Sequence, residues 1–349
     1  MKIYTDDGYL NVPALKATGY PFIWVCGGRG TGKTYGAIKD MVETHSAQAD
    51  SMIVRRTEKE RVLLESPLLS PVLDYGVDAG KLFAFAPIVG SVGGIFGGVE
   101  EDGKIVPNGD CYGYTAALST FANMRGFNGM SVNTIIFDEF IKQPQVRPIK
   151  DEAGAFFNLY ETVNRNRELN GRKPVQALML ANSFEMANPY FVALGMVDRA
   201  EKMRATGQEV YMDAERGHLL VILSRSCVSA KKADTALYRA TAGSGYAEMA
   251  LANKFSDRGN YTTAKPHTLK GCRPVCFVGD IAVYERKGVG RYYVTTHHTG
   301  NADSYGDSDT ELTRFRRVYG GGLWRAYLVR AVDFDSIAAE IKFREYVIG

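Results

Sequence analysis

The sequence predicts an α/β protein with a mostly parallel sheet, a helical linker and a smaller α+β C-terminal domain. Two observations lead to this fold class. Residues 27–34, GGRGTGKT, are a glycine-rich turn between a strand-like segment and a helix-like segment, and residues 133–140, NTIIFDEF, are an apolar run that ends in two acids. Apolar strands alternate with helical segments up to about residue 180, as in parallel sheets with crossover helices.

The glycine-rich turn fits the phosphate-loop pattern G-x-x-x-x-G-K-[ST]. Its members are Gly27, Gly28, Arg29, Gly30, Thr31, Gly32, Lys33 and Thr34. A strand–turn–helix context points backbone N–H groups and the positive end of a helix dipole at an anion. Lys33 is then expected to bind the β- and γ-phosphates of ATP, and the Thr34 hydroxyl to ligate Mg²⁺.

The second run predicts the remainder of an ATPase site. Asp138 and Glu139 follow a buried strand, and ligands of open α/β sheets bind at the carboxyl ends of the strands. Asp138 is expected to hold the Mg²⁺ shell and Glu139 to act as general base toward water. The Asp-Glu order favours a P-loop ATPase of the ASCE type over a kinase.

Composition sets broad limits. The chain has 349 residues, 45% of them hydrophobic and 23% charged, with a net charge of +3. These values indicate a globular protein, with a prior of about two domains. We expect no membrane partner and a cytoplasmic location, because no apolar run reaches the ~18 residues of a membrane helix and the first residues lack a signal-peptide core.

The next segments extend the ATPase domain, predicted over residues 1–197. Residues 51–56 are a second strand ending in two arginines, and residues 82–106 predict short antiparallel strands around a turn at 101–104. A helix is expected over 152–169 and a strand over 175–180. Asn182 follows that strand, where a polar side chain can sense the γ-phosphate.

The predicted linker covers residues 198–228, because this stretch is charged and only weakly helical. The C-terminal domain, 229–349, is richer in Gly, Thr, Tyr and Arg. Within it, 276–285 and 290–296 predict a hairpin, 323–330 a strand or short helix, and 336–347 a helix.

Together these motifs resemble the DNA-packaging motor ATPases of small podoviruses of the phi-29 type, which are terminase-like. The resemblance covers most of residues 20–195 and becomes weak beyond 200. It is carried by the following runs: Ile53–Arg56, Gly28–Gly30, Ile135–Ile141, Asn158–Val163, Arg165–Glu168, and Asn182 with Asn188–Phe191.

The resemblance implies a homo-oligomeric ring, expected to be pentameric, on the portal of an empty viral capsid in the cytoplasm of a bacterial host. The ring would use ATP to drive double-stranded DNA into the capsid. The resemblance leaves open whether a structural RNA is also a partner. It also implies that Arg165 is an arginine finger for a neighbouring subunit. A guanidinium at a domain edge suits that role, and an arginine that caps its own helix is the alternative.

DNA contacts are expected at Arg56, Lys59 and Arg125, although each of these side chains could simply be solvated. Glu58 stands where the family pattern has a lysine, with Lys59 beside it. A motor that moves over every sequence should bind the backbone of DNA and not the base edges.

The resemblance further implies that the C-terminal domain is a vestigial ribonuclease-H-like fold that binds nucleic acid or the portal. Two alternatives stay open. The first is a terminase-like ATPase with an active C-terminal nuclease, for which Asp280, Asp303, Asp307 and Asp309 are the candidate acids. The second is an assembly protein in which ATP only switches ring formation, and Glu139 argues against it.

Overall fold

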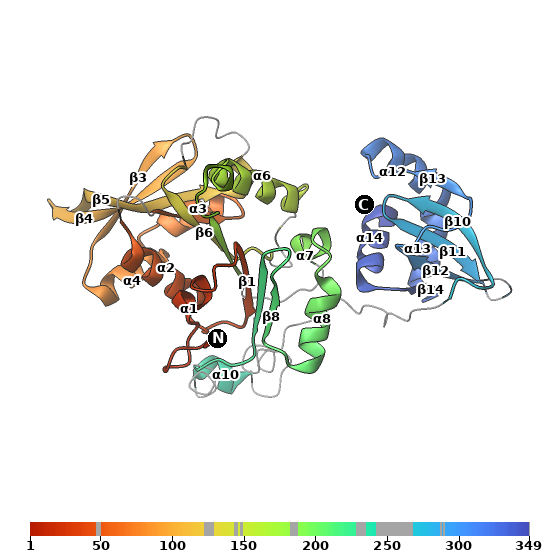
Figure 1. The fold of residues 1–349 in the computed structure, drawn as a ribbon, viewed down its shortest axis with the longest axis horizontal. Helices are drawn as coiled ribbons and strands as arrows, with labels where there is room; N and C mark the ends of the chain where they lie inside the picture. Colours follow the sequence, from red (N-terminus) through yellow and green to blue (C-terminus); the bar gives the residue numbers. More distant parts are fainter. Residues whose placement is uncertain are drawn as a thin grey trace. The chain divides into compact units, whose positions relative to one another are not determined.

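The computed structural model describes residues 1–46, 50–121, 129–142, 146, 149–181, 188–227, 235–241, 268–286, 288 and 290–348. The chain divides into two compact units. The first comprises Met1–Glu185 and Lys202–Ser256, and the second comprises Met186–Glu201 and Asp257–Gly349. Figure 1 shows both units, and each is described by itself below.

Unit 1 is built on a nine-stranded sheet in the order β3-β4-β5-β2-β6-β7-β1-β9-β8. Its strands are β1 (Phe22–Gly27), β2 (Asp50–Arg55), β3 (Phe83–Val89), β4 (Val92–Glu101), β5 (Lys104–Ala117), β6 (Val132–Asp138), β7 (Gln176–Ala181), β8 (Val210–Asp213) and β9 (His218–Leu223). The six strands from β5 to β9 in this order are mutually parallel. The predicted fold class, a mostly parallel α/β sheet, is confirmed.

Both faces of this sheet are buried, which explains why its central strands are continuous apolar runs. On one face Val25 and its neighbours join a cluster with α1 (Val12–Lys16), α2 (Lys33–Thr44) and α4 (Pro71–Ala79). On the other face Phe137 packs against Phe156 of α6 (Glu152–Asn164). The unit also contains the helices α3 (Glu58–Glu65), α5 (Leu118–Phe121) and α10 (Ala236–Ala240) and a short 3-10 helix at Glu168–Asn170.

The antiparallel segment predicted over 82–106 is present as β3, β4 and β5. The β4–β5 turn lies at Asp102 and Gly103, both of which have positive φ. β5 is longer than predicted, because its second half stays paired with β4 and also pairs in parallel with β2. This strand therefore joins the hairpin to the central sheet.

The predicted linker at 198–228 is wrong in its second half. Residues 210–223 form β8 and β9, and β9 pairs in parallel with β1. The prediction followed the charged stretch at 198–216, whereas the apolar run His218–Leu223 pairs with β1, far away in the sequence. The first part of the segment is helical, in α8 (Val197–Thr206), and it follows α7 (Pro189–Ala193).

Unit 2 contains a five-stranded sheet in the order β13-β10-β11-β12-β14. Its elements are β10 (Cys272–Val278), β11 (Ile281–Arg286), β12 (Arg291–Thr295), β13 (Asp303–Tyr305), α12 (Asp309–Phe315), α13 (Gly321–Leu328), β14 (Val332–Phe334) and α14 (Ile337–Ile348). Phe315, Phe334 and Phe343 lie in its buried core. The smaller α+β domain is thus confirmed, as is the β11–β12 hairpin. Residues 276–285 are two strands and not one, because the chain turns at Gly279 and Asp280.

Candidate active site

The glycine-rich turn lies between the end of β1 and the start of α2, as predicted. Gly30 and Gly32 have φ of 83° and 76°, left-handed values that favour glycine. Gly27 is required for a different reason, since a Cβ there would lie 2.8 Å from the Cβ of Leu223 on β9. The loop is therefore shaped by its own glycines and by the strand beside it.

Lys33 is folded back over this loop and is only 4% exposed. Its ammonium donates to the carbonyl oxygens of Gly28 at 2.7 Å and Gly27 at 3.0 Å, and to the Thr31 hydroxyl at 3.0 Å. The ammonium charge of Lys33 therefore lies at the N-terminus of α2. This position suits a phosphate, which would bind the ammonium and the loop N–H groups together.

Asp138 lies at the carboxyl end of β6 and reaches the start of α2. The Thr34 hydroxyl donates to both of its carboxylate oxygens at 3.1 Å. Burial raises the pKa of the Asp138 carboxyl, and the positive charge of Arg55 partly offsets that shift. A hydroxyl beside a carboxylate is the type of oxygen donor set that Mg²⁺ prefers, so these two residues fit the expected metal.

Arg55 is a site residue that the sequence prediction missed. Its guanidinium lies 2.8 Å from a carboxylate oxygen of Asp138 and 3.7 Å from one of Glu139. In the described structure its buried Nε has no hydrogen-bond partner. β2 is the neighbour of β6 in the sheet, so an arginine at the end of a strand adjacent to the Asp-Glu strand was the available signal.

Glu139 follows β6 with φ of 59°, which is uncommon for a residue other than glycine. Such a backbone costs of order 1–3 kcal/mol and tends to occur at functional sites. The side chain is about one-third exposed. Glu139 thus remains accessible to water while its neighbour Asp138 is buried.

Three of the predicted site residues lie away from this cluster or outside the described residues. Arg165 caps the C-terminus of α6, is exposed, and donates from Nε to the carbonyl of Thr162 at 3.3 Å. The adjacent Asn164 accepts a bond from the N–H of Val175, just before β7 starts. Arg165 therefore lies at the amino edge of the sheet, opposite the phosphate loop of its own chain. Asn182 and Arg125 fall outside the described residues.

The predicted DNA contact at Arg56 is not supported. Arg56 is 1% exposed and forms a two-bond ion pair with the buried Glu152, at 2.6 and 2.7 Å. Its partner is distant in sequence, so the pattern of neighbouring residues did not show the burial. Lys59 is exposed on α3, so it remains a candidate for DNA contact. Arg29 in the phosphate loop is also exposed.

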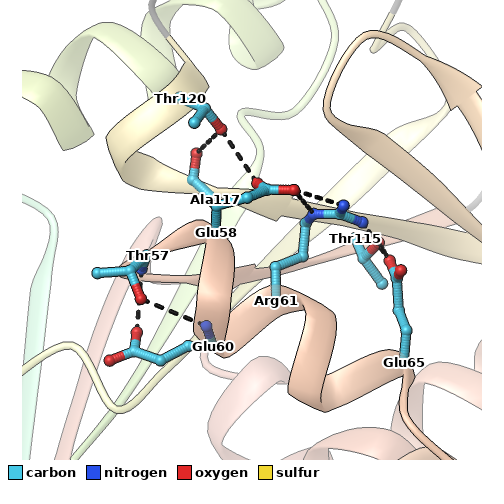
Figure 2. A network of polar contacts seen from close by, with 8 residues as sticks. All are labelled: Thr57, Glu58, Glu60, Arg61, Glu65, Thr115, Ala117 and Thr120. Atoms are coloured by element: carbon cyan, nitrogen blue, oxygen red, sulfur yellow. Dashed lines mark hydrogen bonds and ion pairs between the residues drawn. The ribbon is translucent and has the colours of Figure 1, made fainter.

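Glu58, which replaces the lysine of the family pattern, belongs to a polar network (Figure 2). Arg61 donates to Glu58 and to Glu65, and Thr120 donates to Glu58. Glu65 in turn accepts a hydrogen bond from Thr115 of β5. Glu58 therefore links α3 to α5 through Thr120, and Glu65 links α3 to β5.

The candidate nuclease acids of unit 2 are dispersed. Asp280 pairs with Lys342 at 3.3 Å, and Asp303 accepts a bond from Tyr319 at 2.6 Å. No group of three or more His, Cys, Asp or Glu side chains in the described ranges is arranged to hold a metal. The helices in those ranges also include none long and apolar enough to cross a membrane.

Comparison with known proteins decides the family. The model of the Podovirus DNA encapsidation protein (Gp16) family matches residues 99–292, more than half of the chain. The chain belongs to this family. The predicted resemblance to phi-29-type packaging proteins is thereby confirmed.

Relatives and solved structures agree with this membership in the Gp16 family. The DNA packaging proteins of Bacillus phages phi29 and PZA are 29% and 28% identical over 233 residues, which are 66% of this chain and 61% of theirs. A Phi-28 gp11 DNA packaging motor chain is similar in fold, with a TM-score of 0.67, 19% identity and 98% of each chain covered. A chain of the bacteriophage Phi-29 viral genome packaging motor assembly is also similar in fold. Its TM-score is 0.65 at 20% identity, and the match covers 98% of this chain and 96% of that one. These two likenesses show the fold.

Proposed function

We propose that this Gp16-family chain hydrolyses ATP and uses the energy to move double-stranded DNA into an empty viral capsid. The observation that carries the proposal is the cluster of Lys33, Thr34 and Asp138 at the carboxyl edge of the sheet, with Glu139 beside it. Its relatives are DNA packaging proteins, and the similar structures come from packaging motors. We expect the capsid portal to be the docking partner.

The roles of the residues follow from their positions. Lys33 and the N–H groups of the loop bind the phosphates, and Thr34 and Asp138 would hold Mg²⁺. The metal would neutralise charge on the phosphate oxygens. Glu139 accepts the proton of the attacking water. Arg55 competes with the metal for Asp138, because its guanidinium already lies 2.8 Å from that carboxylate.

Arg165 supports assembly into a ring. It is exposed at the amino edge of the sheet, whereas the phosphate loop of the same chain lies at the carboxyl edge. In this role the guanidinium reaches the nucleotide of a neighbouring subunit. We propose a homo-oligomeric ring on that basis, and the pentamer implied by the family stays a prediction.

The test is ATP hydrolysis and DNA encapsidation by the full chain. With Mg²⁺, duplex DNA and portal-bearing capsids of its own phage, the wild type should hydrolyse ATP and yield DNA that resists DNase. Lys33→Ala should lose both activities, and Lys39→Ala, which removes an exposed lysine from the same helix, should keep them. Encapsidation that continues in Lys33→Ala would contradict the proposal.

A further inference from the structure

A cavity of about 670 Å³ lies at the amino edge of the unit 1 sheet, at the opposite ends of the strands from the phosphate loop. It lies where β2, β6 and β7 begin, and it is lined there by Ser51, Thr134 and Gln176. Its volume falls within the roughly 300–1,000 Å³ typical of small-molecule sites. We call it the amino-edge cavity.

A buried guanidinium lines this cavity without an acidic partner. Arg167 is 6% exposed and donates to the side-chain oxygen of Asn133 and to the carbonyls of Met130 and Val132, at 2.7–2.8 Å. In the described ranges no carboxylate forms an ion pair with it. Burial lowers the pKa of Arg167, and the nearby charge of Arg172 adds to this shift. A buried charge of this kind is costly unless an opposite charge accompanies it.

Two more cations stand at the rim. Arg172 and Lys173 line the cavity and are exposed, and Arg172 donates to the carbonyl of Met130 at 3.2 Å. Neither pairs with a carboxylate of the described chain. A further lining cation, Lys16, is already matched by Asp40 at 2.6 Å.

The acid that lines the cavity is Asp50, and it has partners of its own. His45 lies 3.6 Å from its carboxylate, and the Tyr114 hydroxyl donates to it at 3.4 Å. One lining carboxylate therefore stands against the three cations Arg167, Arg172 and Lys173. The cavity keeps a positive excess.

Two hydroxyl groups also line the cavity. Ser51 and Thr134 line it and are each 5% exposed. Neither side chain forms a hydrogen bond within the part of the chain that the structure describes. Both hydroxyls can therefore donate a hydrogen bond to a ligand in the cavity.

We propose that the amino-edge cavity is a second phosphate-binding site, separate from the phosphate loop. Guanidinium groups bind phosphate oxygens through paired N–H donors, and the two hydroxyls add donors from the sheet edge. The phosphate belongs either to a nucleic-acid backbone or to a free nucleotide. None of the lining residues belongs to the candidate catalytic cluster of the same chain.

The test uses the full chain with Lys33→Ala, which removes phosphate binding at the loop. Inorganic phosphate, ADP and a short DNA duplex are titrated separately by calorimetry. Arg172→Gln/Lys173→Gln should weaken binding about tenfold, equivalent to about 1.4 kcal/mol. Lys39→Gln/Lys104→Gln removes the same charge from exposed positions elsewhere in unit 1 and should change the affinity less than about twofold.

The two sources give different patterns. If the phosphate comes from nucleic acid, the rim variant weakens duplex binding, and the affinity falls with salt. If it comes from a free nucleotide, the variant weakens ADP and phosphate binding but not duplex binding. Ser51→Ala is a second test variant, because it removes only a hydroxyl group from the cavity lining. Equal affinities of the rim and control variants for all three probes, or no binding of any probe, would overturn the proposal.

Discussion

At the residue scale, the candidate active site depends on a few side chains that are held in unusual ways. Lys33 is buried against its own loop, Asp138 is buried beside Arg55, and Glu139 has a left-handed backbone. Each arrangement costs free energy in an isolated chain. The cost is consistent with a site built for charged ligands.

We expect Glu139→Gln to stop hydrolysis while ATP binding persists. The amide cannot accept a proton from water, but the phosphate loop and Asp138 are unchanged. Lys33→Ala should instead weaken binding itself. Nucleotide affinity by fluorescence and phosphate release by a coupled assay separate the two effects. A Glu139→Gln variant that hydrolyses ATP at the wild-type rate would remove Glu139 from the role of general base.

At the element scale, α3 begins in a capping box and is then tied to the sheet. The Thr57 hydroxyl accepts from the N–H of Glu60, and the Glu60 carboxylate accepts from the N–H of Thr57 (Figure 2). α3 begins shortly after Arg55, the last residue of β2. The stability of this helix start therefore supports the position of Arg55 at the site.

Thr57→Ala should lower the free energy of unfolding of unit 1 by about 1 kcal/mol, the usual cost of losing an N-cap. Thr57→Ser retains the hydroxyl and should lose far less. Urea unfolding followed by circular dichroism measures both variants. The same stability for Thr57→Ala and Thr57→Ser would mean that the cap does not stabilise the fold.

The junction of β1 and β9 contains a titratable contact. His218 accepts a hydrogen bond from the Trp24 indole at 3.2 Å and packs against Phe22, with ring centroids 5.3 Å apart. Burial lowers the pKa of His218 from its ordinary value of 6.5. The folded state therefore binds fewer protons than the unfolded state, and this contact loses stability as the pH falls through about 6.5.

His218→Gln removes the titration and keeps an acceptor for Trp24. We expect the unfolding midpoint of the wild type to decrease more between pH 7 and pH 5.5 than that of this variant. Thermal unfolding at several pH values tests the difference directly. Parallel curves for the two proteins would show that His218 does not titrate across the transition.

At the scale of the whole molecule, different groups of residues lie at the carboxyl and amino edges of the sheet, that is, at the two ends of its parallel strands. The carboxyl edge holds the candidate catalytic cluster, and the amino edge holds Arg165 and the amino-edge cavity. A strand of five to six residues separates these edges by about 17–20 Å. If Arg165 acts as the proposed arginine finger, its target is therefore the nucleotide of another copy of the chain.

Mixing variants tests this requirement. Arg165→Ala should keep its nucleotide affinity but lose turnover, because an arginine finger contributes roughly 10³–10⁵ in rate. Combined with Glu139→Gln subunits, it should recover part of the activity, since some interfaces then hold an intact Arg165 beside an intact Glu139. Lys39→Ala is the matched control for loss of a surface charge. Mixtures that stay as inactive as the separate variants would place the role of Arg165 within one subunit.

The local patterns predicted which residues form the candidate catalytic cluster but not the long-range pairings. The phosphate loop and the Asp138–Glu139 pair are short motifs on strands, and the structure places them together. Arg56 was misjudged because Glu152, far along the chain, buries it. β9 was missed inside the predicted linker, although His218–Leu223 is the continuous apolar run expected of a buried parallel strand.

β1 lies between β7 and β9 in the sheet, and this strand order has a consequence during protein synthesis. β1 is translated early, whereas its two neighbours are made much later. At ~5–20 residues per second, the delay before β9 emerges is roughly 10–40 s. Throughout that interval the strand that leads into the phosphate loop has open edges, which can pair with other chains. A chain that terminates before His218 would keep one edge of β1 unpaired, because β9 would be missing.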